Sequence, residues 1–239
     1  MIFINALVGL VVGSLLNWAS DYLPRFASSS VAPSFETTPR PTSALWYLLR
    51  TFTSRKDQPR FPRYSWLGVG VEILTASLFA YLWKQFGLSW RLLSVASGCS
   101  FFLLIAIIDL KHRLVLNMLV YPAMVVALLL HSLPPGKDTV AALLGGAVGL
   151  FPFLLVALMK PGSIGGGDVK LATLIGLTAG FPQVLWALSS GILAGGFAAL
   201  FLLLTRRWAL RDQIPYAPFL CLGVIVAFVY DPFSSLFAF

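Results

Sequence analysis

Charged side chains are scarce in this sequence. Of its 239 residues, 11% are charged and 58% are hydrophobic, whereas soluble domains carry about 25% charged residues. A soluble core of this size cannot hide so much apolar surface, so the excess must face lipid. Aromatic residues make up 14% of the chain, which suits anchoring at membrane interfaces. The composition therefore predicts an integral membrane protein.

Thiols and imidazoles are also few, which limits the metal and nucleophile chemistry open to the chain. The two cysteines, Cys99 and Cys221, lie in apolar runs and are predicted to be small buried hydrophobic side chains. The two histidines, His112 and His131, are 19 residues apart with no glutamate beside them, so the H-E-x-x-H helix of a zinc protease is missing. Ser163 has no clear base partner, and the glycines that follow it lack the G-K-[ST] of a phosphate loop.

Apolar stretches recur along the chain, and a spanning helix needs roughly 20 mostly apolar residues. The sequence predicts an all-α, polytopic membrane protein with about eight transmembrane helices in a single membrane-embedded domain, 1–239. The only long polar stretch, 24–66, is rich in Pro, Ser, Thr and Arg and separates the first two helices. The predicted helices are 2–22, 67–86, 91–108, 114–131, 138–159, 167–181, 183–204 and 215–231.

Lysine and arginine are distributed unevenly over the predicted connections. If the eight helices alternate in direction, 14 of the 17 basic residues fall on one side of the membrane and 3 on the other. Basic residues mark cytoplasmic loops, so we expect loop 24–66 in the cytoplasm and both termini on the opposite side. The same rule explains the net charge of +8 without nucleic acid as a partner.

Acidic residues number only nine, and a carboxylate at mid-bilayer costs about 2.5–3.5 kcal/mol, so each one in a predicted span needs a reason. Glu72 lies about one turn inside the second predicted helix, where it could pair with a loop arginine such as Arg63. Asp109 directly follows the third predicted helix, 91–108, and, taken alone, would be a helix-end charge. Asp168 begins the sixth, where an aspartate can cap a helix.

Asp109 and Asp168 indicate more as a pair. The predicted helix directions bring both to the cytoplasmic face, although they are 59 residues apart. Two carboxylates held close cannot both ionise cheaply, so they share a proton. One can then act as base on a water while the other acts as acid toward a scissile carbonyl, which is aspartic-protease chemistry and needs no metal. The three glycines 165–167 would let an extended peptide backbone come close.

Five motifs, in order along the chain, resemble the bacterial type IV prepilin peptidase family of G-x-G-D aspartyl proteases. The resemblance implies that Asp109 and Asp168 are the catalytic aspartates. It also implies residues that bind substrate or support the active site, namely Gly165, Gly167, Lys170 and Glu72. The matching segments are 9–17 with Leu23-Pro24, Arg63-Tyr64 with 71–75, 108–110 with Asn117 and Tyr121-Pro122, 165–171, and 214–220.

This resemblance implies a hydrolase of the bacterial inner membrane that cuts leader peptides on the cytoplasmic side. Its expected partners are type IV prepilins or type II secretion pseudopilins, together with membrane lipids. No cofactor or metal is expected for the peptidase. Many relatives hold zinc in the first loop through two C-x-x-C pairs, but 24–66 contains no cysteine. The family's N-methylation is therefore not expected, and S-adenosylmethionine would be needed only if it were retained.

Other classes of protein also fit part of the pattern. A glycine break in a membrane helix can mark a transporter site, so a transporter or channel could use Asp109 and Asp168 to bind ions or protons. A non-catalytic membrane assembly factor is a further alternative. An archaeal preflagellin peptidase is a sibling within the enzyme class, and the first-helix and last-helix motifs argue against it. Cleavage of a peptide by the purified protein would separate a peptidase from the other two classes.

Overall fold

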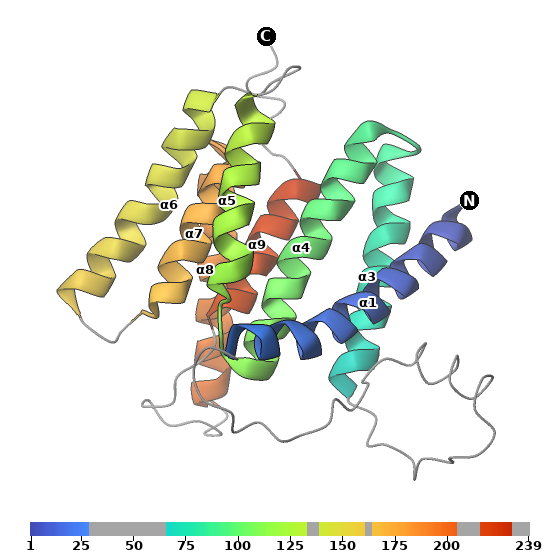
Figure 1. Ribbon diagram of the computed structural model, residues 1–239, viewed down its shortest axis with the longest axis horizontal. Helices are drawn as coiled ribbons and strands as arrows, with labels where there is room; N and C mark the ends of the chain where they lie inside the picture. The colour runs from blue at the N-terminus through green and yellow to red at the C-terminus, as the bar shows by residue number, and fades with distance from the viewer. Residues whose placement is uncertain (29–65, 133–138, 161–163, 205–215, 231–239) are drawn as a thin grey trace. The chain divides into compact units, whose positions relative to one another are not determined.

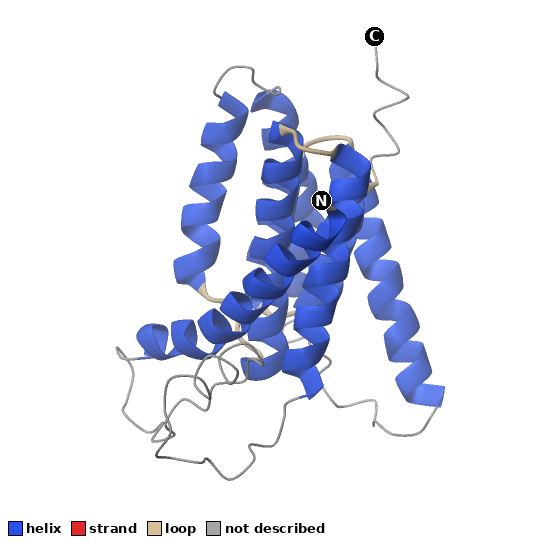
Figure 2. Cartoon of the chain, turned by 90° about the vertical axis from the view of Figure 1, so that its right-hand side faces the viewer, coloured by secondary structure: helices blue, strands red, loops and turns tan. Residues whose placement is uncertain are grey.

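The computed structural model describes residues 1–28, 66–132, 139–160, 164–204 and 216–230, and most of them are helical. These residues form eight helices and no strand, which confirms the predicted all-α class (Figure 1, Figure 2). Each predicted helix corresponds to one of them. They are α1 (Ile2–Ser28), α3 (Trp66–Phe86), α4 (Trp90–His112), α5 (Asn117–Ser132), α6 (Thr139–Met159), α7 (Gly166–Ala179), α8 (Gln183–Leu204) and α9 (Ala217–Val229).

The largest difference from the predicted helix ends concerns α1. The sequence predicts 2–22, whereas the helix runs to Ser28 with Pro24 inside it. Proline removes one backbone hydrogen bond and often ends a helix, but a membrane helix can tolerate it when other groups satisfy the freed carbonyl. The predicted loop 24–66 therefore begins as helix, and its remaining residues 29–65 lie outside the described part of the chain.

Several helices can cross a bilayer by length and composition. In the described part of the chain four qualify, namely residues Ile2–Pro24 of α1, all of α4 and α6, and Gln183–Phe201 of α8. The helices α5 and α9 are apolar but shorter. With 14 residues, α7 is about 21 Å long, against a hydrocarbon core of about 30 Å. The chain is a multi-pass membrane protein.

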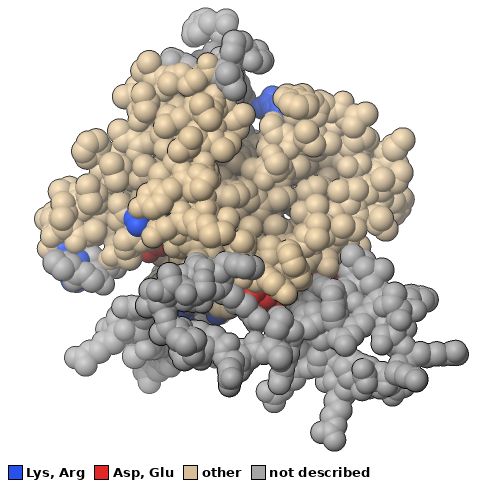
Figure 3. Space-filling view, in the orientation of Figure 1, with Lys and Arg blue, Asp and Glu red and all other residues tan. Residues whose placement is uncertain are grey.

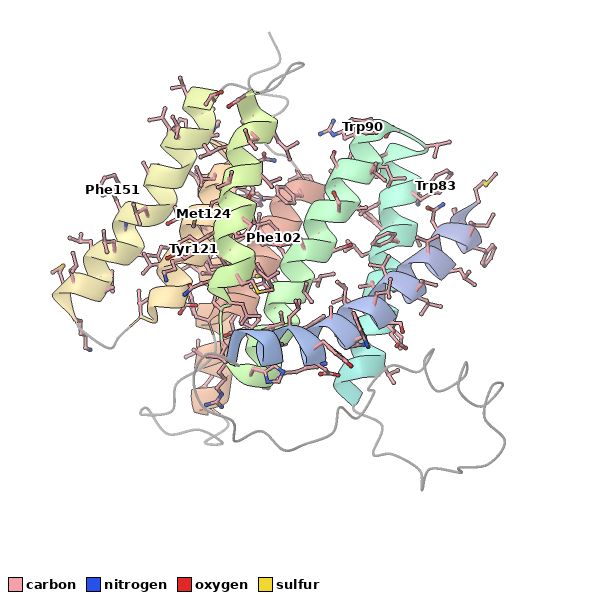
Figure 4. All side chains as sticks on the ribbon, viewed as in Figure 1. Trp83, Trp90, Phe102, Tyr121, Met124 and Phe151 are labelled. Atoms are coloured by element: carbon pink, nitrogen blue, oxygen red, sulfur yellow. The ribbon has the colours of Figure 1, made fainter. Side chains whose placement is uncertain are left out.

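Large apolar side chains are exposed on these helices. Phe151 is 66% exposed and projects outward from α6 (Figure 4), and Phe197 of α8 is 70% exposed. On the face drawn in Figure 3, few atoms of the described residues belong to Lys, Arg, Asp or Glu. Exposed apolar patches of this kind are rare on soluble monomers, and they suit contact with lipid tails.

The chain divides into two compact units, Met1–Ile107 and Ile108–Phe239, which are described separately. In the first unit α1 and α3 pack against each other. A Cβ on Gly9 would lie 2.7 Å from the carbonyl oxygen of Thr75, and one on Gly13 would overlap the Thr75 hydroxyl. Small residues let helices approach closely in lipid, where apolar side chains gain little by leaving it.

Polar side chains are buried along this α1–α3 contact. The amide of Asn17 donates to the carbonyl of Gly68 at 3.0 Å, and the hydroxyl of Thr75 donates to the carbonyl of Val71 at 2.9 Å. Glu72, one helical turn after Gly68, is 6% exposed. The Asn17–Gly68 bond joins the two helices and favours one arrangement of them, because an unsatisfied polar group in a dry interior is costly. The Thr75–Val71 bond lies within α3.

In the second unit α7 is the central helix, since it packs against α5, α6, α8 and α9. Its residues Leu171, Leu174 and Ile175 have no exposed surface. The closest neighbour is α6, where a Cβ on Gly145 would overlap the carbonyl of Gly176. The beginning of α7 is thus positioned by helices on several sides.

Candidate active site

Asp109 lies in the last turn of α4 and is 6% exposed. The helix ends just after it, because Arg113 adopts a left-handed backbone with φ of 54°. The amide of Arg113 donates to the carbonyl of Asp109 at 2.8 Å, which is the geometry of a left-handed C-terminal cap. The cap is usually glycine, since other residues pay a steric penalty there. The Arg113 guanidinium also interacts electrostatically with the Asp109 carboxylate.

Asp168 is the third residue of α7, whose N-cap is Gly165. Its carboxylate accepts a hydrogen bond from the backbone N–H of Gly165. This is half of a capping box, in which the third helical residue reaches back to the N-cap amide. The positive end of the helix dipole also favours a carboxylate here. Asp168 therefore has a local structural role as well as a candidate chemical one.

The two aspartates lie in the same part of the second unit, as the effect of the Asp109 charge on Asp168 indicates. Cys221, a free and fully buried cysteine of α9, experiences the charges of both carboxylates. The structure thus brings together the two residues that the sequence analysis pairs. Two nearby carboxylates repel each other when both are ionised, so a proton shared between them is the expected state.

Tyr216 is a neighbour of the pair that the sequence analysis did not select as a site residue. It is the N-cap of α9, and its ring lies on the backbone of Gly195 in α8, where an added Cβ would meet Tyr216 Cε2 at 2.8 Å. Burial and, to a smaller extent, the charge of Asp168 raise the pKa of the Tyr216 hydroxyl. The phenol therefore keeps its proton and can donate a hydrogen bond.

The three glycines before Asp168 differ in their surroundings. Among the described residues, a Cβ on Gly166 would meet nothing within 4 Å, and one on Gly165 would meet only the Asp168 carboxylate, at 3.5 Å. A Cβ on Gly167 would come within 2.9 Å of the Val115 Cβ. Gly167 thus has a packing reason within the chain, whereas Gly165 and Gly166 leave exposed backbone beside the carboxylate.

Lys170 lies one helical turn after Gly166 in α7, and its side chain reaches α5. Its ammonium donates to the side-chain oxygen of Asn117 at 2.9 Å and lies 5.1 Å from the centre of the Tyr121 ring. Figure 4 labels Tyr121, which projects from α5. Both the amide oxygen and the ring face are suited to a cation.

Glu72, the remaining predicted support residue, lies in the first unit and is buried in α3. Arg63, the partner that the sequence suggests for it, falls outside the described residues. Among the residues that the structure describes, no group of three His, Cys, Asp or Glu side chains could hold a metal ion.

Comparison with known proteins covers most of the chain. The sequence model described as the type IV leader peptidase family matches residues 96–203. Over 234 residues the chain is 28% identical to the prepilin leader peptidase/N-methyltransferase of Bacillus subtilis (strain 168). The matched region covers 96% of this chain and 94% of the relative. No solved structure gives a significant match. The range 96–203 contains Asp109, Asp168 and Lys170.

Proposed function

Because residues 96–203 of this chain belong to the type IV leader peptidase family, as the motifs predict, we propose that the protein is a membrane aspartyl endopeptidase. Its substrates are type IV prepilins or type II secretion pseudopilins, from which it removes the leader peptide. The name of the Bacillus subtilis relative supports a prepilin as substrate. The observation that carries the aspartic mechanism is that the charge of Asp109 acts on Asp168.

In this mechanism the pair holds one proton between two carboxyl groups. The ionised carboxylate takes a proton from a water, and the resulting hydroxide attacks the carbonyl carbon of the scissile peptide bond. The protonated carboxyl group gives its proton to the carbonyl oxygen, and a tetrahedral intermediate forms. The intermediate then collapses: the C–N bond breaks, the leaving amine takes up a proton from the pair, and a hydroxyl group of the intermediate returns a proton to the pair as the new carboxyl group forms. No metal or cofactor takes part in these steps.

The two carboxyl groups have different surroundings. Asp168 accepts the Gly165 N–H bond at the start of α7. Asp109 lies in the last turn of α4, is 6% exposed and interacts with the Arg113 guanidinium. Either carboxyl group can act as the base at the start of the reaction, and the other then acts as the acid.

The substrate would approach along the exposed backbone of Gly165 and Gly166. Among the described residues, a Cβ added to either glycine would meet nothing within 4 Å except the carboxylate of Asp168, so a peptide in extended form can come near the reacting group. The hydrophobic helix of a prepilin would lie in the bilayer beside the enzyme, and its basic leader would remain in the cytoplasm. Loop 24–66 is basic itself and is assigned to anionic lipid headgroups.

The membrane assigned to the protein is the bacterial inner membrane, with cleavage on the cytoplasmic side. The support is the bias of 14 basic residues to 3 across the predicted spans. Asp109 and Asp168 border cytoplasmic connections in that arrangement. Nucleic acid is not a partner in this account, because the positive charge is explained by membrane topology.

Methylation of the product is not part of the proposed function. The name of the Bacillus subtilis relative includes N-methyltransferase, but loop 24–66 of this chain lacks the cysteines that hold zinc in many family members. S-adenosylmethionine would be a cofactor only if that second activity were retained.

Co-expression with a candidate prepilin tests this function. The mature N-terminus of the pilin is read by mass spectrometry, which also shows whether it carries a methyl group. We expect a cleaved and unmethylated product. An intact prepilin, together with ion- or proton-dependent uptake by reconstituted protein, would instead favour the transporter alternative.

A further inference from the structure

A polar contact between α5 and α7 joins the two chain segments that follow Asp109 and Asp168, and the mechanism above does not use it. The Lys170 ammonium donates to Asn117 at 2.9 Å and stands over the Tyr121 ring. We propose that these three residues, the α5–α7 clasp, position Asp109 and Asp168 relative to each other. The proposal rests on the aspartic mechanism, and Asn117 and Lys170 act in it as positioning residues.

The clasp joins the two segments that carry the aspartates. Asn117 is the first residue of α5, and only the turn 113–116 separates it from the end of α4, where Asp109 lies. Lys170 is two residues after Asp168 in the first half of α7. A hydrogen bond between Asn117 and Lys170 therefore joins the start of α5, which follows the Asp109 segment, to the first half of α7, which carries Asp168.

A second contact in the same place supports this reading. Val115, in the turn between α4 and α5, lies on Gly167 so closely that a Cβ there would be 2.9 Å away. The apolar contact and the polar clasp thus hold the same two segments at neighbouring positions. One contact alone would leave the turn free to pivot about it, whereas two fix its orientation.

The lysine is suited to this task because its surroundings satisfy a cation without neutralising it. The structure pairs it with an amide oxygen and a ring face, both uncharged. An aspartate or glutamate in place of Asn117 would add a third carboxylate close to the catalytic pair. The electrostatic interaction between charges depends on their separation, so proton sharing between Asp109 and Asp168 is sensitive to small shifts of either segment.

Three variants of purified, reconstituted protein test the clasp. Asn117→Ala removes the acceptor, Lys170→Met removes the donor and the charge, and the double variant removes both. Gln183→Ala is the matched control, since Gln183 donates to the carbonyl of Ala227 at the same 2.9 Å and joins α8 to α9. Prepilin cleavage is measured for kcat, KM and the pH profile of kcat.

We expect each single variant to lower kcat about 10- to 100-fold with KM nearly unchanged, since small misplacements of reacting groups act on the chemical step. The limbs of the pH profile should move, because the shared proton depends on the separation of the pair. The double variant should be no worse than the worse single one, as expected for residues that act through one contact. Lys170→Arg, which keeps a charged donor, should recover much of the rate.

Two results would overturn the positioning role. A raised KM with unchanged kcat would mean that the residues touch substrate directly, and effects no larger than those of Gln183→Ala would mean that the contact is only a helix tie. Hydrogen exchange tests the clasp without activity: Asn117→Ala should speed amide exchange in 113–120 and 165–171, and Gln183→Ala should not. If exchange changes in this way while the wild-type protein cleaves no prepilin, the clasp stands and the proposed function fails; unchanged exchange removes the clasp itself.

Discussion

Val115 lies directly on the backbone of Gly167, so that a Cβ added to Gly167 would be 2.9 Å from the Cβ of Val115 and 3.1 Å from its Cγ2. Real side chains do not come this close, and one of the two segments would have to move. We expect Gly167→Ala to destabilise the fold, because overpacking costs about 1–3 kcal/mol. Thermal unfolding in detergent, followed by loss of helical signal, measures the effect.

The neighbouring glycine provides the control for this prediction. Apart from its own neighbours along the chain, no described residue lies within 4 Å of the position of a Cβ on Gly166, so Gly166→Ala should leave stability unchanged or raise it by up to about 1 kcal/mol. In a Val115→Gly background, Gly167→Ala should lose its penalty. A penalty that persists there would show that Val115 is not the cause.

A second packing prediction concerns α6 and α7. A Cβ on Gly176 would overlap the carbonyl of Gly145, and backbone cannot yield as a side-chain end can. Gly176→Ala should therefore lower the unfolding temperature and make α7 more accessible to protease. Gly196→Ala in α8, where nothing lies within 4 Å, is the matched variant and should have little effect. Equal behaviour of the two would contradict the close packing.

Hydropathy predicted the helices well because lipid demands long apolar segments whose backbone is satisfied internally. The ends were harder to predict. The end of α1 lies beyond Pro24 at Ser28, since a proline in a membrane helix can be accommodated by its surroundings. The start of α5 is Asn117, three residues after the predicted start, because Arg113 turns the chain in a left-handed conformation.

The candidate site was predictable only in part. A carboxylate next to a span is expensive, and this singled out Asp109 and Asp168 from the residues alone. Two other features could not be predicted from the sequence, because they depend on how α5, α7 and α9 pack. They are the Asn117–Lys170 bond and the place of Tyr216 near Asp168. The different roles of Gly166 and Gly167 could not be predicted from a run of three glycines.

The membrane topology is a third testable feature. Strict alternation of eight spans puts 14 basic residues on the cytoplasmic side. A reporter fused after Phe239 should therefore report the non-cytoplasmic side, and one inserted near Ser54 should report the cytoplasm. Both reporters on one side of the membrane would contradict the eight-span arrangement.

The fourth prediction concerns metal. Loop 24–66 contains neither cysteine nor histidine, and a structural zinc site needs about four such ligands. Peptidase activity should survive strong chelation, and purified protein should contain no stoichiometric zinc. Elemental analysis that finds about one zinc per chain would refute this expectation and would reopen the question of methylation.

The central claim is that Asp109 and Asp168 together activate the attacking water. Asp109→Asn and Asp168→Asn each remove one proton-exchanging group at nearly constant size, so each should abolish cleavage of a prepilin by purified protein, a loss of at least about 100-fold. Asp21→Asn in α1 changes a carboxylate of the first unit and should leave the rate near that of the wild type. All variants are first shown to be inserted and helical. Near wild-type cleavage by either the Asp109 or the Asp168 variant would contradict the aspartic mechanism.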